Sequence, residues 1–265
     1  SWTMHLWGCD RLVIDGVYVY TTQRSGVWAD GIGPDGCKDV RISNCVIETG
    51  DDALVFYSSN LFGPARPCED ITVTNCRLSS SSSAIKFCDG NQNCVRRVVI
   101  DNCVITNSNR GVAFMVFDGG YVSDVVLSNL VIDCTRRDWF WWGDGEALHF
   151  NIKRRSEIHA SVPKFPVQPI GAIRNVIIRN LIARGNGSSV ILGHPESYLE
   201  NVTFDNIRLF LSAVPDHPMQ QKAEHALKIR WARNLKLRDI EVHWEKPSSE
   251  KWQSALYLED IQGLE

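Results

Sequence analysis

Apolar and polar residues alternate with a period of two along much of this chain, and the alternation recurs in a repeated unit. The unit reads polar, apolar, any residue, apolar, any residue, Asn or Asp, apolar. Its copies are DVRISNC ending at Cys45, DITVTNC at Cys76, VVIDNC at Cys103, DVVLSNL at Leu130, NVIIRNL at Leu181, NVTFDNI at Ile207 and NLKLRDI at Ile240. A first copy, RLVIDGV, ends at Val17 and has Gly16 at the Asn or Asp position. A period of two is that of a β-strand, because successive side chains point to opposite faces. Each copy therefore predicts two short strands joined at the Asn or Asp.

A third apolar run lies between successive copies, as in ALVF at 53–56, AIKF at 84–87 and ALHF at 147–150. Three strands per repeat, at intervals of mostly 26 to 33 residues, are typical of a solenoid. We predict an all-β fold: a single-stranded right-handed parallel β-helix of about eight to nine coils, with three parallel sheets around one core.

One interval, from Leu130 to Leu181, spans 51 residues and is about twice as long as its neighbours. The excess predicts an inserted loop at about 135–170, and long insertions in repeat proteins usually lie on the binding face. We expect one domain over residues 1–265. Both ends fall within repeats and lack the polar caps of a solenoid, so we expect a portion of a longer chain.

The composition limits the classes of partner. The 265 residues are 44% hydrophobic and carry a formal net charge of -3, which excludes a disordered chain and provides no basic field for nucleic acid. No apolar run approaches the roughly eighteen residues of a membrane span, so we expect no membrane partner.

The nine cysteines form no Cys-x-x-Cys pair and stand beside no histidine at zinc spacing, so we expect no metal site. Cys45, Cys76 and Cys103 share one repeat position, which predicts buried free thiols stacked from rung to rung. Cys88 and Cys94 flank a short loop and are the candidate disulfide.

Three carboxylates stand just before the third strand type on two adjacent rungs: Asp30 in WADGIG, and Asp51 with Asp52 in GDDALVF. Equivalent positions on successive rungs stack about 4.8 Å apart. Like charges at that distance raise one another's proton affinity, so one group can stay an acid while another is a base. Carboxyl groups roughly 6.5–9.5 Å apart would indicate an inverting glycosidase, and about 5 Å a retaining one. The competing interpretation is that these aspartates cap turns.

Asp-Gly-Ile from Asp30, followed by the Gly-Asp-Asp that contains Asp51 and Asp52, resembles glycoside hydrolase family 28, the polygalacturonases and their relatives in the pectin-lyase-like β-helix superfamily. The resemblance covers nearly the whole chain in its rungs. It implies inverting hydrolysis of a pectin-type or related plant-wall polysaccharide or oligosaccharide, with no cofactor. Asp51 would be the general acid, and Asp30 with Asp52 would activate the water. A secreted or periplasmic protein is also implied, and we favour a monomer.

The sequence departs from two other motifs of that family. At the Gly-His-Gly position it has Ser82, Ser83 and Ala84, and at the Arg-x-Lys position it has Ala113 and Met115. The family's Arg and Lys grip the carboxylate of galacturonate, so we expect a substrate other than plain polygalacturonate. We expect the cations of Lys86 and Arg110 to bind substrate in their place.

Six further residues are candidates for substrate binding. The indoles of Trp141 and Trp142 can stack on sugar rings, although large aromatic side chains also cover cores. Glu146 and His149 follow the predicted turn at 143–145, and a lone histidine can also be structural. The remaining two are Ser83, at the Gly-His-Gly position, and His5, which we expect to face outward on the rung before Asp30.

Two other functions fit the same residues. A polysaccharide lyase would use the three aspartates to hold Ca²⁺ and Arg110 as the base. A non-catalytic, glycan-binding β-helix would explain the missing histidine and Arg-x-Lys residues.

Overall fold

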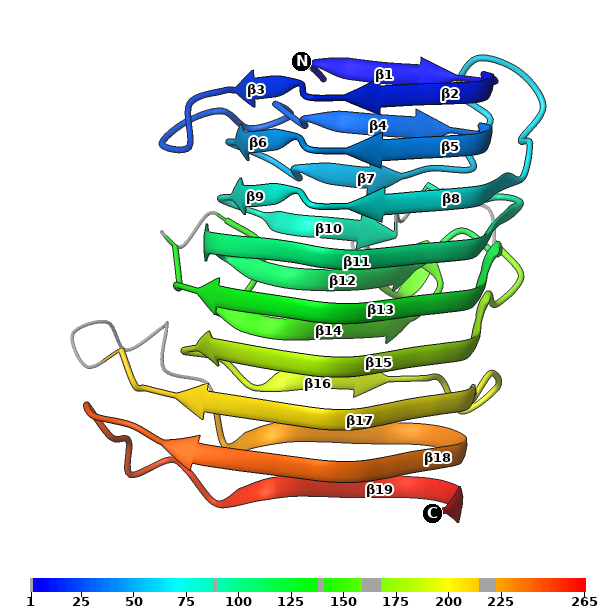
Figure 1. The fold of residues 1–265 in the computed structure, drawn as a ribbon. Coiled ribbons are helices and arrows are strands. Elements are labelled where there is room, and N and C mark those ends of the chain that lie inside the picture. The colour runs from blue at the N-terminus through cyan, green and yellow to red at the C-terminus, as the bar shows by residue number, and fades with distance from the viewer. Residues whose placement is uncertain (1, 88–89, 138–140, 159–167, 215–222) are drawn as a thin grey trace.

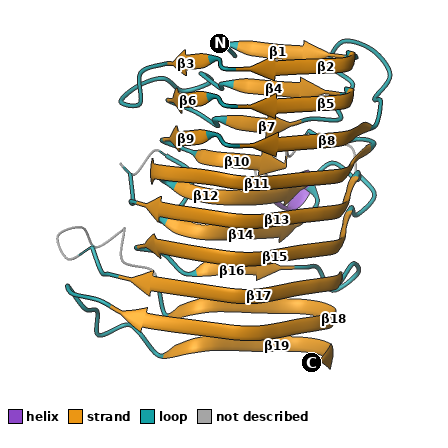
Figure 2. Ribbon diagram, in the orientation of Figure 1, coloured by secondary structure: helices purple, strands orange, loops and turns teal. Residues whose placement is uncertain are grey.

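The structure of this chain is a computed structural model that describes residues 2–87, 90–137, 141–158, 168–214 and 223–265. Its strands pair in parallel, each with the equivalent strand of the neighbouring rungs. Figure 1 shows the rungs stacked from the N-terminus at one end to the C-terminus at the other, and strands dominate the ribbon in Figure 2. The predicted all-β parallel β-helix is confirmed.

The first ladder positions the functional site and has nine segments among the described residues. They are β1 (Met4–Trp7), β4 (Ile32–Asp35), β7 (Leu54–Phe56), β10 (Ser83–Phe87), β12 (Arg110–Val116), β14 (Glu146–Ile152), β16 (Ser189–Leu192) and the starts of β18 (His225–Trp244) and β19 (Ser254–Leu264). Nine segments agree with the eight to nine coils that the repeat predicts.

The second and third ladders begin as separate strands and then merge. The second starts with β2 (Asp10–Asp15), β5 (Lys38–Ser43) and β8 (Cys68–Thr74), and the third with β3 (Tyr18–Tyr20), β6 (Val46–Thr49) and β9 (Arg77–Ser80). From β11 (Cys94–Ser108) onward one strand runs through both, as in β13 (Tyr121–Cys134), β15 (Ala172–Gly185) and β17 (Leu199–Leu211). The three predicted sheets are therefore joined by continuous strands.

The bends between ladders depend on Asn and Asp in the left-handed backbone region. Their short polar side chains bond locally, so they tolerate a positive φ better than other non-glycine residues. At the second bend of successive rungs, φ lies between 49° and 55° for Asn44, Asn75, Asn102, Asn129, Asn180, Asn206 and Asp239. Amides at this bend also bond between rungs, as Asn180 Nδ2 does to Asn129 Oδ1 at 2.9 Å.

The core is filled by columns of equivalent side chains. Phe87 lies 5.2 Å from Phe56 and 4.2 Å from Phe114, and Phe150 lies 4.1 Å from Phe114, all between ring centroids. The eight described cysteines are free, and seven of them are buried, which confirms the predicted thiol columns. Cys88 lies outside the described residues, so its pairing with Cys94 stays a prediction.

The predicted loop at 135–170 is divided by a regular strand. Within it β14 pairs with β12 and β16 as an ordinary rung of the first ladder, because its alternating apolar side chains enter the core. The single helix among the described residues is α1 (Arg155–Ile158), and no described helix is long and apolar enough to cross a membrane. Trp139 and Phe140, which precede Trp141 in the sequence, lie outside the described residues.

Candidate active site

Asp30, Asp51 and Asp52 meet at the start of the first ladder. Ile32 of β4 pairs with Leu54 of β7, which places Asp30 and Asp52 in register on adjacent rungs, each two residues before its strand. One carboxylate oxygen from each of the three aspartates lies within 4.8 Å of the others. All three side chains are buried. The register therefore brings together the carboxylates that the repeat predicts.

Burial and mutual repulsion favour the protonated forms of two of these groups. Burial, followed by the charges of Asp52 and Asp51, raises the pKa of Asp30 to about 8. Burial and the Asp52 charge raise the pKa of Asp51 to about 6. Between pH 6 and 8 this pair therefore holds one proton. Because the two groups titrate as a coupled pair, this proton belongs to the pair, and Asp51 can carry it as the acid that the resemblance implies.

Asp52 is held by two donors from the next rung. The Ser83 backbone N–H donates to Oδ1 at 2.9 Å, and the Lys86 ammonium donates to Oδ2 at 2.8 Å. Lys86 points outward from β10 by the alternation of the strand. Its charge compensates that of Asp52 within a buried cluster, where an unpaired carboxylate would be costly.

Asp51 is oriented by the loop that precedes Asp30. The backbone N–H of Trp28 donates to Asp51 Oδ2 at 3.0 Å, and Asp52 N–H donates to Oδ1 at 3.0 Å. Trp28 has a φ of 65°, an unfavourable conformation for a bulky residue and one that often marks a functional site. A Cβ on Gly50 would lie 2.3 Å from the Thr22 carbonyl oxygen, so only glycine lets this loop pack against Asp51.

The aspartates line a cavity of about 440 Å³. Its wall is largely aromatic and apolar, and the residues of that kind are Trp2, Trp28, Tyr57, Leu61, Met115, Phe117, Trp142 and Ile158. The rings of Trp28 and Trp142 lie 6.2 Å apart between centroids. A concave site with a few convergent polar groups suits a small saccharide unit.

Arg110 enters the cavity from β12 and is anchored behind it. Its Nε donates to Glu146 Oε1 at 2.9 Å, and the same oxygen lies 2.9 Å from His149 Nδ1. Although burial opposes it, the Arg110 charge and the His149 hydrogen bond lower the pKa of Glu146 to about 2. Burial and the Arg110 charge lower the pKa of His149. Glu146 and His149 therefore position Arg110.

Sequence comparison assigns the family. Residues 1–136, just over half of the 265, match the family model described as glycosyl hydrolases family 28. This chain belongs to family 28. No curated protein sequence matches it.

Solved structures share the fold of this family 28 chain. A hyperthermoactive exopolygalacturonase from Thermotoga maritima is 19% identical with a TM-score of 0.69, covering 91% of this chain and 49% of its own. The Yersinia enterocolitica family 28 exopolygalacturonase is 13% identical with a TM-score of 0.66, covering 98% and 43%. The Streptococcus pneumoniae surface protein and adhesin PfbA is 12% identical with a TM-score of 0.54, covering 98% and 66%. This chain therefore spans about half the length of the first two.

Three of the predicted substrate-binding residues line the cavity of this family 28 chain: Lys86, Arg110 and Trp142. Two others lie behind it, because Trp141 is buried and the Ser83 side chain is fully buried. Ser83 acts on Asp52 through its backbone instead. His5 stacks on Trp2 at 4.5 Å between centroids and thus supports the wall.

The lining residues that sequence reasoning missed include Trp2, Trp28 and Tyr57. Trp28 stands two residues before Asp30 in the same segment, which was an available signal. The Tyr57 hydroxyl donates to Asp30 Oδ2 at 2.6 Å, and Tyr57 directly follows β7. Arg155 comes from α1, far along the chain, and no repeat position indicates its approach.

The spacing of the carboxylates differs from the expectation for an inverting enzyme. Their nearest oxygens lie within 4.8 Å, below the separation of about 6.5–9.5 Å typical of inverting glycosidases. The short spacing arises because Asp30 and Asp52 stack on adjacent rungs, whose separation is about 4.8 Å. The same three oxygens could also hold a cation, but the Lys86 ammonium already supplies a positive charge at Asp52.

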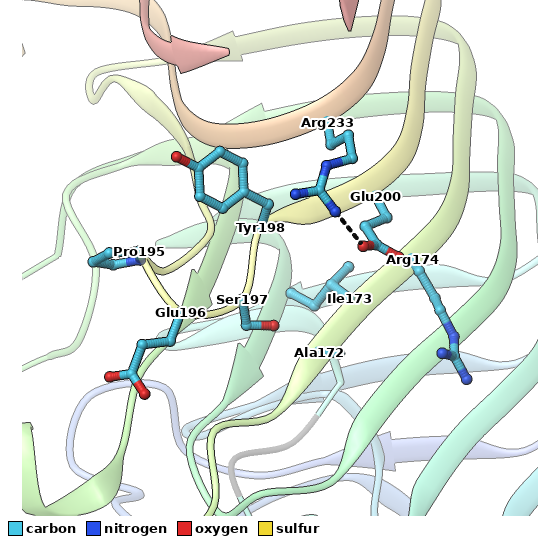
Figure 3. Close-up of a pocket in the computed structure, with 9 residues that line it drawn as sticks. All are labelled: Ala172, Ile173, Arg174, Pro195, Glu196, Ser197, Tyr198, Glu200 and Arg233. Carbon is cyan, nitrogen blue, oxygen red and sulfur yellow. Dashed lines mark hydrogen bonds and ion pairs between the residues drawn. The ribbon is translucent and has the colours of Figure 1, made fainter. Parts of the chain in front are cut away.

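A second hollow of about 340 Å³ lies on the rungs of β15, β17 and β18. Figure 3 shows its lining, in which Arg233 bonds to Glu200 at 3.2 Å beside the ring of Tyr198. Asp30, Asp51 and Asp52 lie on the rungs of β4 and β7. This hollow is therefore separate from the cavity described above.

Proposed function

We propose that this chain hydrolyses a glycosidic bond in a pectin-type or related plant-wall polysaccharide or oligosaccharide. The observation that supports it is the group of three buried carboxylates, with oxygens within 4.8 Å, that lines a saccharide-sized cavity. If these aspartates only capped turns, their carboxylates would not need to converge on one cavity. Since a plant-wall polymer lies outside cells, the proposal includes a secreted or periplasmic protein, acting as a monomer.

In the proposed reaction Asp51 donates its proton to the glycosidic oxygen, and the bond between that oxygen and the anomeric carbon breaks. A water held by Asp30 and Asp52 attacks the anomeric carbon and gives up a proton to this pair. Lys86 forms an ion pair with Asp52 and places a positive charge beside it for that role. Attack by water on the opposite face inverts the anomeric centre.

Leaving-group dependence tests the roles of the aspartates. Asp51→Asn should reduce kcat/KM by more than about 100-fold on a substrate with a sugar leaving group, since general acid catalysis contributes that much. A 2,4-dinitrophenyl glycoside needs no protonation, so its hydrolysis should be largely retained. Asp30→Asn and Asp52→Asn should lose both activities. If Asp51→Asn kept full activity on every substrate of the parent, the acid would be misassigned.

Product stereochemistry tests the proposed inversion. Proton NMR of the first product should show the anomer opposite to that of the substrate. Retention would instead assign a carboxylate as nucleophile, as the short carboxylate spacing alone would favour.

A calcium-dependent lyase is the second candidate, because three carboxylate oxygens within 4.8 Å can hold a cation. Arg110 is poorly placed to act as its base, because its guanidinium is ion-paired with Glu146. A lyase would form a product that absorbs in the ultraviolet and would lose activity on chelation. We expect neither result.

A further inference from the structure

The cations around the cavity are already paired with carboxylates. Lys86 donates to Asp52 at 2.8 Å, Arg110 to Glu146 at 2.9 Å, and Arg155 Nε to Asp118 Oδ1 at 2.6 Å. The carboxylates of these pairs are all buried. A substrate carboxylate would therefore have to displace a buried partner, which would then lose its own compensating charge.

The local balance of charge is not positive. Among the described residues that line the cavity or pair with its lining, five carboxylates face three cations: Asp30, Asp51, Asp52, Asp118 and Glu146 against Lys86, Arg110 and Arg155. Even with both Asp30 and Asp51 protonated, the cations only equal the remaining carboxylates. An anionic sugar gains nothing from such a site, and it is repelled when either aspartate ionises.

The wall beside Arg110 is apolar where a substrate-gripping cation would be expected. Met115 occupies the second Arg-x-Lys position, and its Sδ lies 3.8 Å from Arg110 Nη1. Phe117 follows on the same segment, and the indoles of Trp28 and Trp142 lie across the cavity lining. Aromatic faces and a thioether suit the C–H face or a methyl group of a neutral sugar.

We propose that the sugar whose glycosidic bond is cleaved is neutral, a hexose or a deoxyhexose, and not a uronate. The inference rests on the proposed hydrolysis at Asp30, Asp51 and Asp52, and it names the substrate class of that site. A neutral sugar in a side chain or in the backbone of a pectin-type polymer fits both the proposed hydrolysis and this substrate class.

Matched aryl glycosides test the inference through turnover. The panel pairs p-nitrophenyl glycosides of neutral hexoses with the corresponding uronides, in both anomers, and adds 6-deoxyhexosides. We expect kcat/KM at least 10-fold higher for the best neutral glycoside than for any uronide. A uronide that is cleaved equally well or better overturns the inference while leaving the proposed hydrolysis intact.

If no aryl glycoside is cleaved, oligosaccharide binding to the Asp51→Asn variant still distinguishes the neutral-sugar inference from the proposed hydrolysis. Calorimetry should show neutral pectic oligosaccharides binding more tightly than oligogalacturonides, with an affinity that does not change between 50 and 500 mM salt. Tighter binding of oligogalacturonides that weakens with salt contradicts the inference, as does no binding of any neutral oligosaccharide. Absence of turnover on every glycan, with neutral binding retained, would instead overturn only the hydrolytic function.

A charge introduced at Met115 provides a matched comparison. Met115→Lys adds a cation without a carboxylate partner to the cavity wall, and Met115→Gln changes polarity at similar size without charge. We expect Met115→Lys, and not Met115→Gln, to shift the ratio of uronide to neutral-sugar binding by at least 10-fold toward the uronide. Equal ratios in the two variants would show that charge at this wall does not select the substrate.

Discussion

The phenol hydroxyl of Tyr57 donates a hydrogen bond of 2.6 Å to Asp30 Oδ2 from the neighbouring rung. The bond favours the ionised carboxylate, so it offsets part of the rise in pKa that burial and the charges of Asp52 and Asp51 cause. Tyr57 therefore helps to set the pH at which the aspartate cluster loses its last proton.

Replacing Tyr57 by phenylalanine removes this hydrogen bond and keeps the ring. With the pKa of Asp30 at about 8 and that of Asp51 at about 6, the singly protonated pair exists between these limits, and we expect a bell-shaped profile of kcat/KM. Tyr57→Phe should move the alkaline limb to higher pH and leave the acidic limb near 6. An unchanged alkaline limb would show that it does not report on Asp30.

Asp30 should also make stability depend on pH. Its folded-state pKa of about 8 lies above the unfolded value, so the folded protein holds a proton that the unfolded chain has released. The free energy of unfolding should fall as pH rises from about 4 to about 8. The fall should be on the order of several kcal/mol. Each unit by which the folded pKa exceeds the unfolded pKa corresponds to about 1.4 kcal/mol.

Denaturant unfolding at pH 5 and pH 8 measures this effect. Asp30→Asn removes the titrating group, so its loss of stability between the two pH values should be clearly smaller than that of the parent. Parallel pH dependences in the two proteins would contradict the raised pKa.

The pair of Arg110 and Glu146 should be sensitive to removal of one partner. Glu146→Ala leaves a buried guanidinium without its carboxylate and should cost about 3–5 kcal/mol of unfolding free energy. The double variant Arg110→Met with Glu146→Leu leaves no unpaired charge and should recover much of that loss. If the loss of unfolding free energy in the double variant equalled the sum of the losses in the two single variants, the two residues would not be energetically coupled.

An asparagine at the second bend contributes to stability in two ways, through its side-chain hydrogen bonds and through its tolerance of a positive φ. Asn180 has a φ of 53°, donates to Asn129 at 2.9 Å and accepts from Asn206 at 3.0 Å. Asn180→Gly loses only the side-chain bonds, at about 1 kcal/mol, whereas Asn180→Ala adds left-handed strain of about 1–2 kcal/mol. Thermal or denaturant unfolding should rank alanine below glycine, and the reverse order would exclude backbone strain as the cause of the loss.

The solenoid could be predicted because its physics is local and repeated. A period of two recurs in every copy, and an Asn or Asp stands at the second bend of every copy except the first, where Gly16 takes its place. Each rung also contacts only its neighbours. Stacking of Asp30 with Asp52 follows from that register alone. The joining of the second and third ladders from β11 onward could not be predicted, because the bend residues look the same where the strand is interrupted and where it continues.

The sequence by itself determined the parallel β-helix, the meeting of the three aspartates and the outward position of Lys86, since these depend only on rung spacing and strand alternation. Tertiary structure decided the rest of the site. The Trp28 loop reaches Asp51 only because Gly50 leaves room for it, and Arg155 arrives from a helix about a hundred residues further along the chain. Which partner neutralises each cation is likewise a matter of three-dimensional distance, and that pairing is the basis for proposing a neutral sugar.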